Sequence, residues 1–453
     1  MEIWKLGVAA AAEAVRSGKI SAEELTRACL SRIAAREGEV HAWAFVDPDH
    51  ALAQARAADD ARQSGQTLGA LHGVPIGIKD IFDTWDMPTE SGSPLHAGRK
   101  PGRDATVVDI LRQAGAVILG KTVTTEFATF HPGKTRNPHD TARTPGGSSS
   151  GSAAAVADFM VPAALGSQTI GSVIRPASFC GVVGFKPSHG LLSRHGMTAL
   201  SRHLDHVGVF ARSVEDVALV TETLAGHDPA DPDTRPVAKP ALLTTARDVP
   251  PVPPKFYFVK TAAWPNLAPD AAEAYAELCS ALGAQDEELP MPEGFENVSE
   301  RIGHVLYPEL AVNLAREYRH GAAQLSEKLR GMIARGRMTL ATDYVHALGA
   351  RAEYRRALDE VFDNCNAILT PAAPGEAGPP ENTGNPVFSM LWTLMGVPAI
   401  TLPLLSGASG LPLGVQLVAR HGDDARLLRT ARWLAEHVAA VTGKKQKKQK
   451  KQH

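Results

Sequence analysis

Cysteine is scarce in this chain of 453 residues. No two cysteines show the C-x-x-C spacing of redox pairs and zinc sites, and they are too far apart to suggest a disulfide framework. A disulfide-stapled secreted domain and a cysteine-bound zinc are therefore excluded, and no H-E-x-x-H spacing predicts another metal site. We expect neither a metal nor a cofactor. The four cysteines are Cys29, Cys180, Cys279 and Cys365.

Long apolar runs are missing as well, because no stretch reaches the roughly 18 residues that a membrane-spanning helix needs. The first residues, MEIWKLGVAAAAEAVRSGK, carry Glu2 and Glu13 through their apolar part, unlike a secretory signal. No strand leads into a G-x-G-x-x-G turn, so no dinucleotide site is predicted. These absences favour a soluble protein of a reducing compartment, and we expect a cytoplasmic location and no membrane partner.

Excess positive charge is absent from the body of the chain. The sequence holds 47 basic and 49 acidic residues, and six of the lysines lie in the last ten residues, KKQKKQKKQH. Without that tail the body is acidic, so it lacks an electrostatic footprint for nucleic acid, and we expect no direct nucleic-acid partner. The tail at 444–453 is low in complexity and self-repelling, which predicts a disordered, solvated end; attraction to nucleic acid or a membrane is the less favoured interpretation.

Short apolar runs alternate with helical patterns along most of the chain. Residues 1–62 read as a helical part, with a capping box formed by Ser21 and Glu24. After it, strand-like runs such as GVPIGIK, AVIL and GVVGF alternate with helices such as SVEDVALVTETL. The alternation predicts an α/β fold: a single large α/β/α domain over residues 1–443, with a mixed central sheet covered by helices on both faces.

Two local motifs predict enzymes of other classes but fit their surroundings poorly. GAVILGKT at 115–122 matches the phosphate-loop pattern, yet its middle residues read as a strand, so Lys121 is interpreted as an ordinary strand-end lysine. GSSSG at 147–151 matches a nucleophile elbow centred on Ser149, yet a polar, turn-rich stretch precedes it where a strand is required. The histidines that could complete that triad are interpreted as surface or loop residues: His189, His195, His203 and His206.

Three other segments bring hydroxyl groups and a lysine into apolar surroundings. GVPIGIKD places Lys79 at the end of a buried strand, PGGSSSGSAAAVA places serines in a tight loop before an Ala-rich helix, and GSQTIGSVIRPASFCG places another serine in a glycine turn. Each alone has a plain structural explanation, as a solvated lysine, a turn or a connection. Together they resemble the amidase signature family of Ser–Ser–Lys hydrolases, over roughly residues 5–440.

The resemblance implies a role for three side chains. It makes Lys79 the base, Ser148 the bridging serine, held by a non-proline cis peptide, and Ser172 the nucleophile. The family's usual spacing between the two serines favours Ser148 over its neighbour Ser149. A serine hydroxyl needs a base to become a nucleophile, and a lysine is a base only when neutral. Burial beside hydroxyl partners must therefore lower the lysine pKa from its ordinary value of about 10.4.

The resemblance also implies an oxyanion hole made by the backbone amides of Thr169, Ile170, Gly171 and Ser172. The family usually has Gly-Gly-Ser here, so Ile170 is a departure that adds β-branched bulk where the substrate carbonyl sits. Arg175 has two interpretations. It is either paired with an internal carboxylate or a clamp for a substrate carboxylate, in the manner of small-acid amidases that share the SVIRPA run.

Three functions follow from this resemblance. The first is an amidohydrolase that cleaves the C–N bond of a small carboxamide, malonamate-like or carboxybiuret-like, through an acyl-enzyme on Ser172. The second is the glutamine-hydrolysing A subunit of a tRNA-dependent amidotransferase, which requires partner subunits. The third is a catalytically impaired binding protein on the same scaffold, suggested by Ile170. A homodimer is left open. Candidate pocket walls, which could equally be core, are Phe130, Met390 and Trp392.

Overall fold

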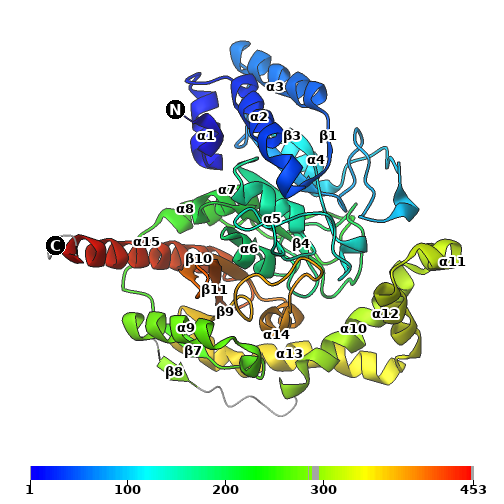
Figure 1. Cartoon of the computed structure of the whole chain (residues 1–453), viewed down its shortest axis with the longest axis vertical. Coiled ribbons are helices and arrows are strands. Elements are labelled where there is room, and N and C mark those ends of the chain that lie inside the picture. The colour runs from blue at the N-terminus through cyan, green and yellow to red at the C-terminus, as the bar shows by residue number, and fades with distance from the viewer. Residues whose placement is uncertain (1, 284, 288–294, 450–453) are drawn as a thin grey trace.

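The computed structural model describes residues 2–283, 285–287 and 295–449, and its central feature is one mixed sheet of 11 strands (Figure 1). The pairs β1–β3, β4–β6, β6–β5, β5–β10, β10–β11 and β11–β9 are antiparallel, and the others are parallel. From one edge to the other the strands are β1 (Trp43–Val46), β3 (Val117–Thr122), β2 (Pro75–Lys79), β4 (Ala163–Gln168), β6 (His206–Ala211), β5 (Val183–Lys186), β10 (Ala399–Ser406), β11 (Pro412–Val418), β9 (Ala367–Pro371), β7 (Phe256–Val259) and β8 (Gln285–Glu287).

Helices cover both faces of this sheet, as the sequence predicts. They are α1 (Val8–Arg16), α2 (Ala22–Val40), α3 (Pro48–Gln63), α4 (Thr106–Gln113), α5 (Ser150–Ala157), α6 (Ile174–Cys180), α7 (Val214–Leu224), α8 (Leu242–Arg247), α9 (Pro269–Leu282), α10 (Val298–Asn313), α11 (Ala315–Gly321), α12 (Glu327–Met338), α13 (Ala341–Asn364), α14 (Val387–Met395) and α15 (Asp424–Gln449). Helices α5 and α6 pack together against the middle of the sheet, and α7 packs against α1, α4, α8 and α15.

The central strands form where short apolar runs become buried on both sides. Every residue of β2, β3 and β4 is buried, which is why these strands read as continuous apolar runs instead of alternating ones. Helix α2 begins at the predicted capping box: the Glu24 amide donates to Ser21 Oγ at 2.9 Å, and the Ser21 amide donates to Glu24 Oε2 at 2.7 Å. Local sequence and burial agree at these elements.

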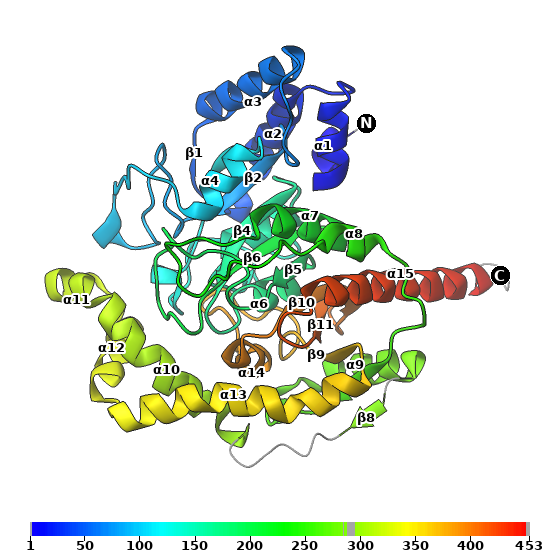
Figure 2. The ribbon, with the colours of Figure 1, turned by 180° about the vertical axis from the view of Figure 1, so that it is seen from behind.

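Two outer layers flank the sheet at opposite ends. Helices α1 to α4 gather at the N-terminal end of the molecule, and α9, α10, α12 and α13 line the other end (Figures 1 and 2). Helix α10 packs against α12, α13 and α14, so the C-terminal layer reaches the centre of the molecule through α14.

Several features differ from the sequence predictions. Residues 1–62 are not purely helical, because β1 pairs with β3 at the edge of the sheet. His206 is not a surface residue: it begins β6, is buried, and its Nδ1 lies 2.7 Å from the Leu204 carbonyl oxygen. Helix α15 continues through Gln449, so residues 444–449 of the predicted disordered tail are helical, whereas 450–453 lie outside the described residues.

Membrane spans and metal-ligand clusters are both missing from the described part of the chain. None of its helices combines the length and apolarity that a membrane crossing requires. No cluster of three or more His, Cys, Asp or Glu side chains within residues 2–283, 285–287 and 295–449 could hold a metal ion. All four cysteines are buried and free of disulfides.

Candidate active site

The site begins where two neighbouring parallel strands end at the same edge of the sheet. Lys79 is the last residue of β2, and β4 pairs with β2 in the register that sets Ile78 beside Leu165. This register brings Ser167, near the end of β4, to Lys79, whose Nζ lies 2.8 Å from Ser167 Oγ. Ser167 is not among the residues predicted from the sequence; its hydroxyl near the end of a buried strand was the available signal.

Ser148 is the second hydroxyl at the lysine. Its Oγ lies 2.8 Å from Lys79 Nζ, and the peptide bond between Gly147 and Ser148 is cis. The loop needs small residues because its backbone runs close to neighbours: a Cβ on Gly151 would lie 2.2 Å from the Ala42 carbonyl oxygen. The Gly/Ser composition at 146–151 therefore reflects close packing and not a flexible tether.

Lys79 lies in surroundings that favour its neutral form. The side chain is fully buried, and no carboxylate of the described residues forms an ion pair with it. Burial lowers the pKa of Lys79 well below its ordinary value; the charge of Asp205 opposes this effect and that of Arg175 adds to it. A neutral amine between two hydroxyls can accept a proton, which is the property that the predicted role requires.

The turn at 169–172 presents backbone amides that the rest of the protein leaves unused. Among the described residues, none of these four N–H groups has a hydrogen-bond acceptor. Gln168 fixes the residues that follow the turn, because its Oε1 accepts from the amides of Val173 at 2.9 Å and Ile174 at 3.0 Å. Free, fixed amides of this kind can receive the negative oxygen of a tetrahedral intermediate. The four residues are Thr169, Ile170, Gly171 and Ser172.

Two further contacts hold this turn. Thr169 Oγ1 donates to Asp205 Oδ1 at 2.6 Å, and Asp205 also accepts from the amides of Leu200 and Ser201. Thr393 of α14 donates to the Ile170 carbonyl oxygen at 2.8 Å. The turn is therefore tied both to the loop before β6 and to α14.

Ile170 fits this turn without backbone strain. It is not among the non-glycine residues with positive φ, so its β-branched side chain does not force a left-handed conformation. Its side chain is buried and lines the cavity in front of Ser172. The departure from Gly-Gly-Ser thus changes the space for substrate more than the positions of the amides.

Ser172 closes the turn just before α6 and borders a narrow cavity of about 20 Å³. That volume holds about one water molecule. Within the described chain, no hydrogen bond joins the hydroxyls of Ser172 and Ser148, so the structure directly joins Lys79 to Ser148 but not Ser148 to Ser172. Of the three candidate pocket walls, Phe130 lines this cavity, whereas Met390 and Trp392 do not.

Arg175 joins the two serine loops. Its Nη2 donates to the Gly147 carbonyl oxygen at 2.6 Å and lies 3.5 Å from Thr383 Oγ1. The side chain is buried and borders the cavity, and its Nε and Nη1 atoms have no partner in the described chain. Burial lowers the pKa of Arg175 to about 9. Since no described carboxylate pairs with it, the internal ion pair is not what the structure shows, and its positive charge is free to face a ligand.

Lys121 and Ser149, which lie in the phosphate-loop and nucleophile-elbow patterns, have structural roles. Lys121 lies near the end of β3 and is fully buried; its Nζ donates to the Phe82 carbonyl oxygen at 2.9 Å and lies 3.3 Å from Asp80 Oδ1. Ser149 donates its hydroxyl to the Ser167 carbonyl oxygen at 3.1 Å. Both side chains therefore stabilise the strand ends around Lys79.

Known proteins resemble this chain along most of its length. A family model described as Amidase matches residues 24–428. This chain belongs to the amidase family. The A subunit of the glutamyl-tRNA(Gln) amidotransferase from Chloroflexus aggregans is 37% identical, over 94% of this chain and 95% of that protein.

Solved structures agree with this assignment. A chain from work described as "An unexpected vestigial protein complex reveals the evolutionary origins of an s-triazine catabolic enzyme" superposes with a TM-score of 0.89 at 29% identity, covering 95% of this chain and 98% of that one. The peptide amidase from Stenotrophomonas maltophilia gives a TM-score of 0.82 at 28% identity, covering 96% and 97%. This amidase is a hydrolase that cleaves amide bonds.

Proposed function

We propose that this amidase hydrolyses a small carboxamide that carries a carboxylate, through an acyl-enzyme on Ser172. The observation that carries the proposal is Arg175: a buried, unpaired guanidinium at the edge of the cavity that Ser172 borders. A guanidinium in this position favours an anionic group on the substrate. The narrow cavity of about 20 Å³ favours a short substrate.

The proposed reaction uses the lysine and both serines. Ser172 Oγ attacks the amide carbonyl carbon while its proton passes to Ser148, whose own proton passes to neutral Lys79. The amides at 169–172 stabilise the oxyanion that forms. When the C–N bond breaks, the proton on Lys79 returns through Ser148 to the leaving nitrogen, and ammonia departs. A water molecule then attacks the acyl-enzyme by the same proton route and releases the acid.

A second candidate is the glutamine-hydrolysing A subunit of a tRNA-dependent amidotransferase. It is favoured by the 37% identity to the A subunit of a glutamyl-tRNA(Gln) amidotransferase along nearly the full length of both chains. Glutamine also carries a carboxylate, which Arg175 could bind. It carries an ammonium group too, and no carboxylate lines the described cavity to receive it, whereas Arg175 would repel it. The cavity lining therefore favours an acid amide without an amino group.

One assay separates the two candidates. The purified chain is given malonamate, a neutral amide of the same length and glutamine, and ammonia release is measured. The proposal expects the fastest release from malonamate. The second candidate would be favoured if glutamine were the only one of the three substrates to be hydrolysed and if its hydrolysis rose when the partner proteins of an amidotransferase were added.

Two variants test the assigned residues in the same assay. Ser172→Ala is expected to lower hydrolysis by at least about 10³-fold and to abolish labelling by a fluorophosphonate. Arg175→Met is expected to raise KM for malonamate by about tenfold or more while the neutral amide is hydrolysed nearly as before. An equal loss for both substrates would assign Arg175 to holding the Gly147 loop instead of binding substrate.

A further inference from the structure

A second and much larger cavity lies away from Ser172. Its volume is about 740 Å³, which is in the range of small-molecule binding sites, and within the described chain it shares no lining residue with the cavity at Ser172. Its walls come from the segments 188–191, 235–240, 348–356 and 421–422. Nothing in the proposed hydrolysis uses these residues.

Two arginines of α13 form the floor of this cavity. Arg351 Nε donates to the Leu394 carbonyl oxygen at 2.8 Å, and Arg355 Nε donates to the Met395 carbonyl oxygen. The end of α14 thus fixes both guanidinium groups by their Nε atoms. The two Nη2 atoms lie close together beside Gly396. A Cβ placed on Gly396 would lie 2.8 Å from Nη2 of Arg355 and 3.2 Å from Nη2 of Arg351.

These converging positive charges have no carboxylate at ion-pair distance in the described chain. Burial and the nearby charge of Arg355 lower the pKa of Arg351 to about 10, whereas the charges of Glu309 and Asp233 oppose this effect from farther away. Burial and the charge of Arg235 lower the pKa of Arg355. Arginine keeps its proton in proteins, so these shifts mean that the positive charge of the pair is only partly balanced.

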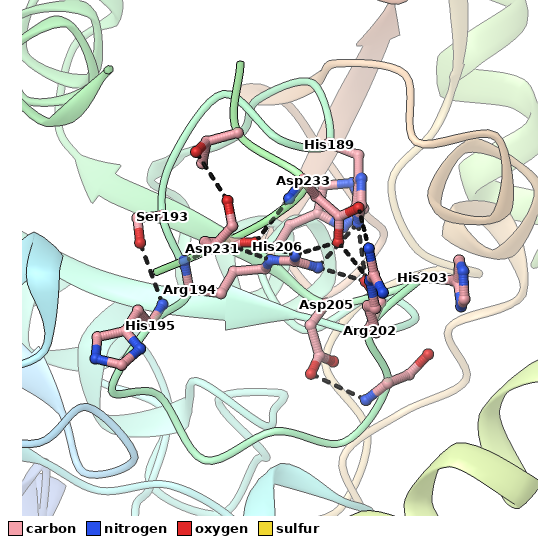
Figure 3. A network of polar contacts seen from close by, with 12 residues as sticks. His189, Ser193, Arg194, His195, Arg202, His203, Asp205, His206, Asp231 and Asp233 are labelled. Atoms are coloured by element: carbon pink, nitrogen blue, oxygen red, sulfur yellow. Dashed lines mark hydrogen bonds and ion pairs between the residues drawn. The ribbon is translucent and has the colours of Figure 1, made fainter. Parts of the chain in front are cut away.

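The acidic residues on the cavity wall are already engaged. Asp233 pairs with Arg194 at 2.6 Å and Arg202 at 3.1 Å, and Figure 3 shows both guanidinium groups directed at it. Asp424 accepts from the amide of Ser188 at 2.8 Å and from its hydroxyl at 2.5 Å. Neither carboxylate therefore forms an ion pair with Arg351 or Arg355, although the charge of Asp233 acts on Arg351 from a distance.

The rest of the lining adds positive charge and apolar surface. Arg235, Lys239 and Arg356 stand at the exposed rim without ion pairs to any described carboxylate. Apolar side chains also line the cavity, including Leu348 of α13 and Leu191. A ligand that matches the cavity has a multiply charged anionic end and an apolar body.

We propose that the cavity between α13 and the loops at 188–191 and 235–240 binds a phosphate monoester with an apolar body. A phosphate monoester carries close to two negative charges at neutral pH and three acceptor oxygens. Those oxygens suit the paired guanidinium groups of Arg351 and Arg355, which bind such groups in forked geometry. The apolar body packs on Leu348 and Leu191. The site is independent of the reaction proposed for Ser172.

Phenyl phosphate is the probe for this site, and isothermal titration calorimetry on the full chain is the measurement. Phenyl phosphate is expected to bind more tightly than inorganic phosphate, which lacks the apolar body, and than benzoate, which lacks the second charge. Arg351→Met and Arg355→Met are each expected to weaken binding by about tenfold or more. Arg27→Met, an exposed change on α2, is the matched control and is expected to leave binding unchanged.

The rim provides a test that does not depend on the half-buried Arg351 and Arg355. If Arg351→Met or Arg355→Met fails to fold, the double variant Arg235→Met/Lys239→Met changes exposed side chains and is expected to weaken phenyl phosphate binding by at least about threefold. Equal affinity for benzoate and phenyl phosphate, no binding of phenyl phosphate, or equal binding to the rim variant and the Arg27→Met control would each overturn the proposal.

Discussion

Replacing Lys79 with methionine should stabilise the folded protein in a pH-dependent way. The folded chain releases the Lys79 proton at a lower pH than the unfolded chain does, because burial lowers the pKa. Between the folded pKa and the unfolded value of about 10.4, the unfolded state binds more protons, so stability rises with pH. One group contributes about 1.4 kcal/mol per pH unit to this slope. Lys79→Met removes this contribution. The free energy of unfolding of the variant is therefore expected to exceed that of the parent chain by the largest amount at the lowest pH measured.

Urea unfolding followed by circular dichroism measures this difference. The free energies of unfolding of the parent chain and Lys79→Met are compared at half-unit steps from about pH 8 to pH 10. Other buried lysines such as Lys121 and Lys186 are present in both proteins, so their contributions cancel in the difference. A difference that is constant with pH would mean that Lys79 titrates normally, and the proton route through Ser148 would then lose its base.

Three other substitutions test the surroundings of Lys79 and Ser172, the proposed base and nucleophile. Ser167→Ala removes one of the two hydroxyls at Lys79 and is expected to lower kcat by about tenfold with KM little changed, whereas an unchanged kcat would leave Ser148 as the sufficient partner. Ile170→Gly enlarges the cavity and is expected to raise kcat/KM for amides one or two carbons longer by about tenfold relative to the shortest substrate; an unchanged ratio would place the size limit elsewhere. Gln168→Leu leaves the amides of Val173 and Ile174 without their acceptor and should cost about 2 kcal/mol in urea unfolding, and a smaller cost would mean that water replaces the amide oxygen.

The fold was predictable where local pattern and burial agree. Strands β2, β3 and β4 are short apolar runs bounded by turn residues, and all their residues are buried. Strand β6, whose run HVGVFA begins with a histidine, was missed. His206 is tolerated there because burial keeps its pKa well below its ordinary value, so it stays neutral. The order of the strands was not predictable, since it depends on pairings between distant segments.

The candidate active site also contains residues that could be predicted from the sequence and residues that could not. Lys79, Ser148 and Ser172 were predicted from a resemblance, and the structure joins the first two directly. Ser167 was missed because its contact with Lys79 depends on β4 lying next to β2, and the two residues are 88 positions apart. The two interpretations of Arg175 differ only in whether a carboxylate lies beside it. Sequence order does not contain that information, whereas the buried contacts of the guanidinium do.

Three buried lysines lie at or near strand ends, and their partners, not their burial, distinguish Lys79, the proposed base, from the other two. Burial lowers the pKa of Lys79, Lys121 and Lys186 alike, the last to about 7. Lys186 donates to the carbonyl oxygens of Val397 and Pro187, which accept hydrogen bonds but have no proton to relay. Lys121 also has hydroxyl partners, Thr89 at 2.6 Å and Thr84 at 3.5 Å, but it lies 3.3 Å from the carboxylate of Asp80, whose negative charge favours the protonated lysine. Lys79 is bonded to two hydroxyls, each of which can accept one proton while giving up another. Of these three lysines, it alone combines hydroxyl partners with the absence of a described carboxylate at ion-pair distance, which is the combination that the proposed base requires.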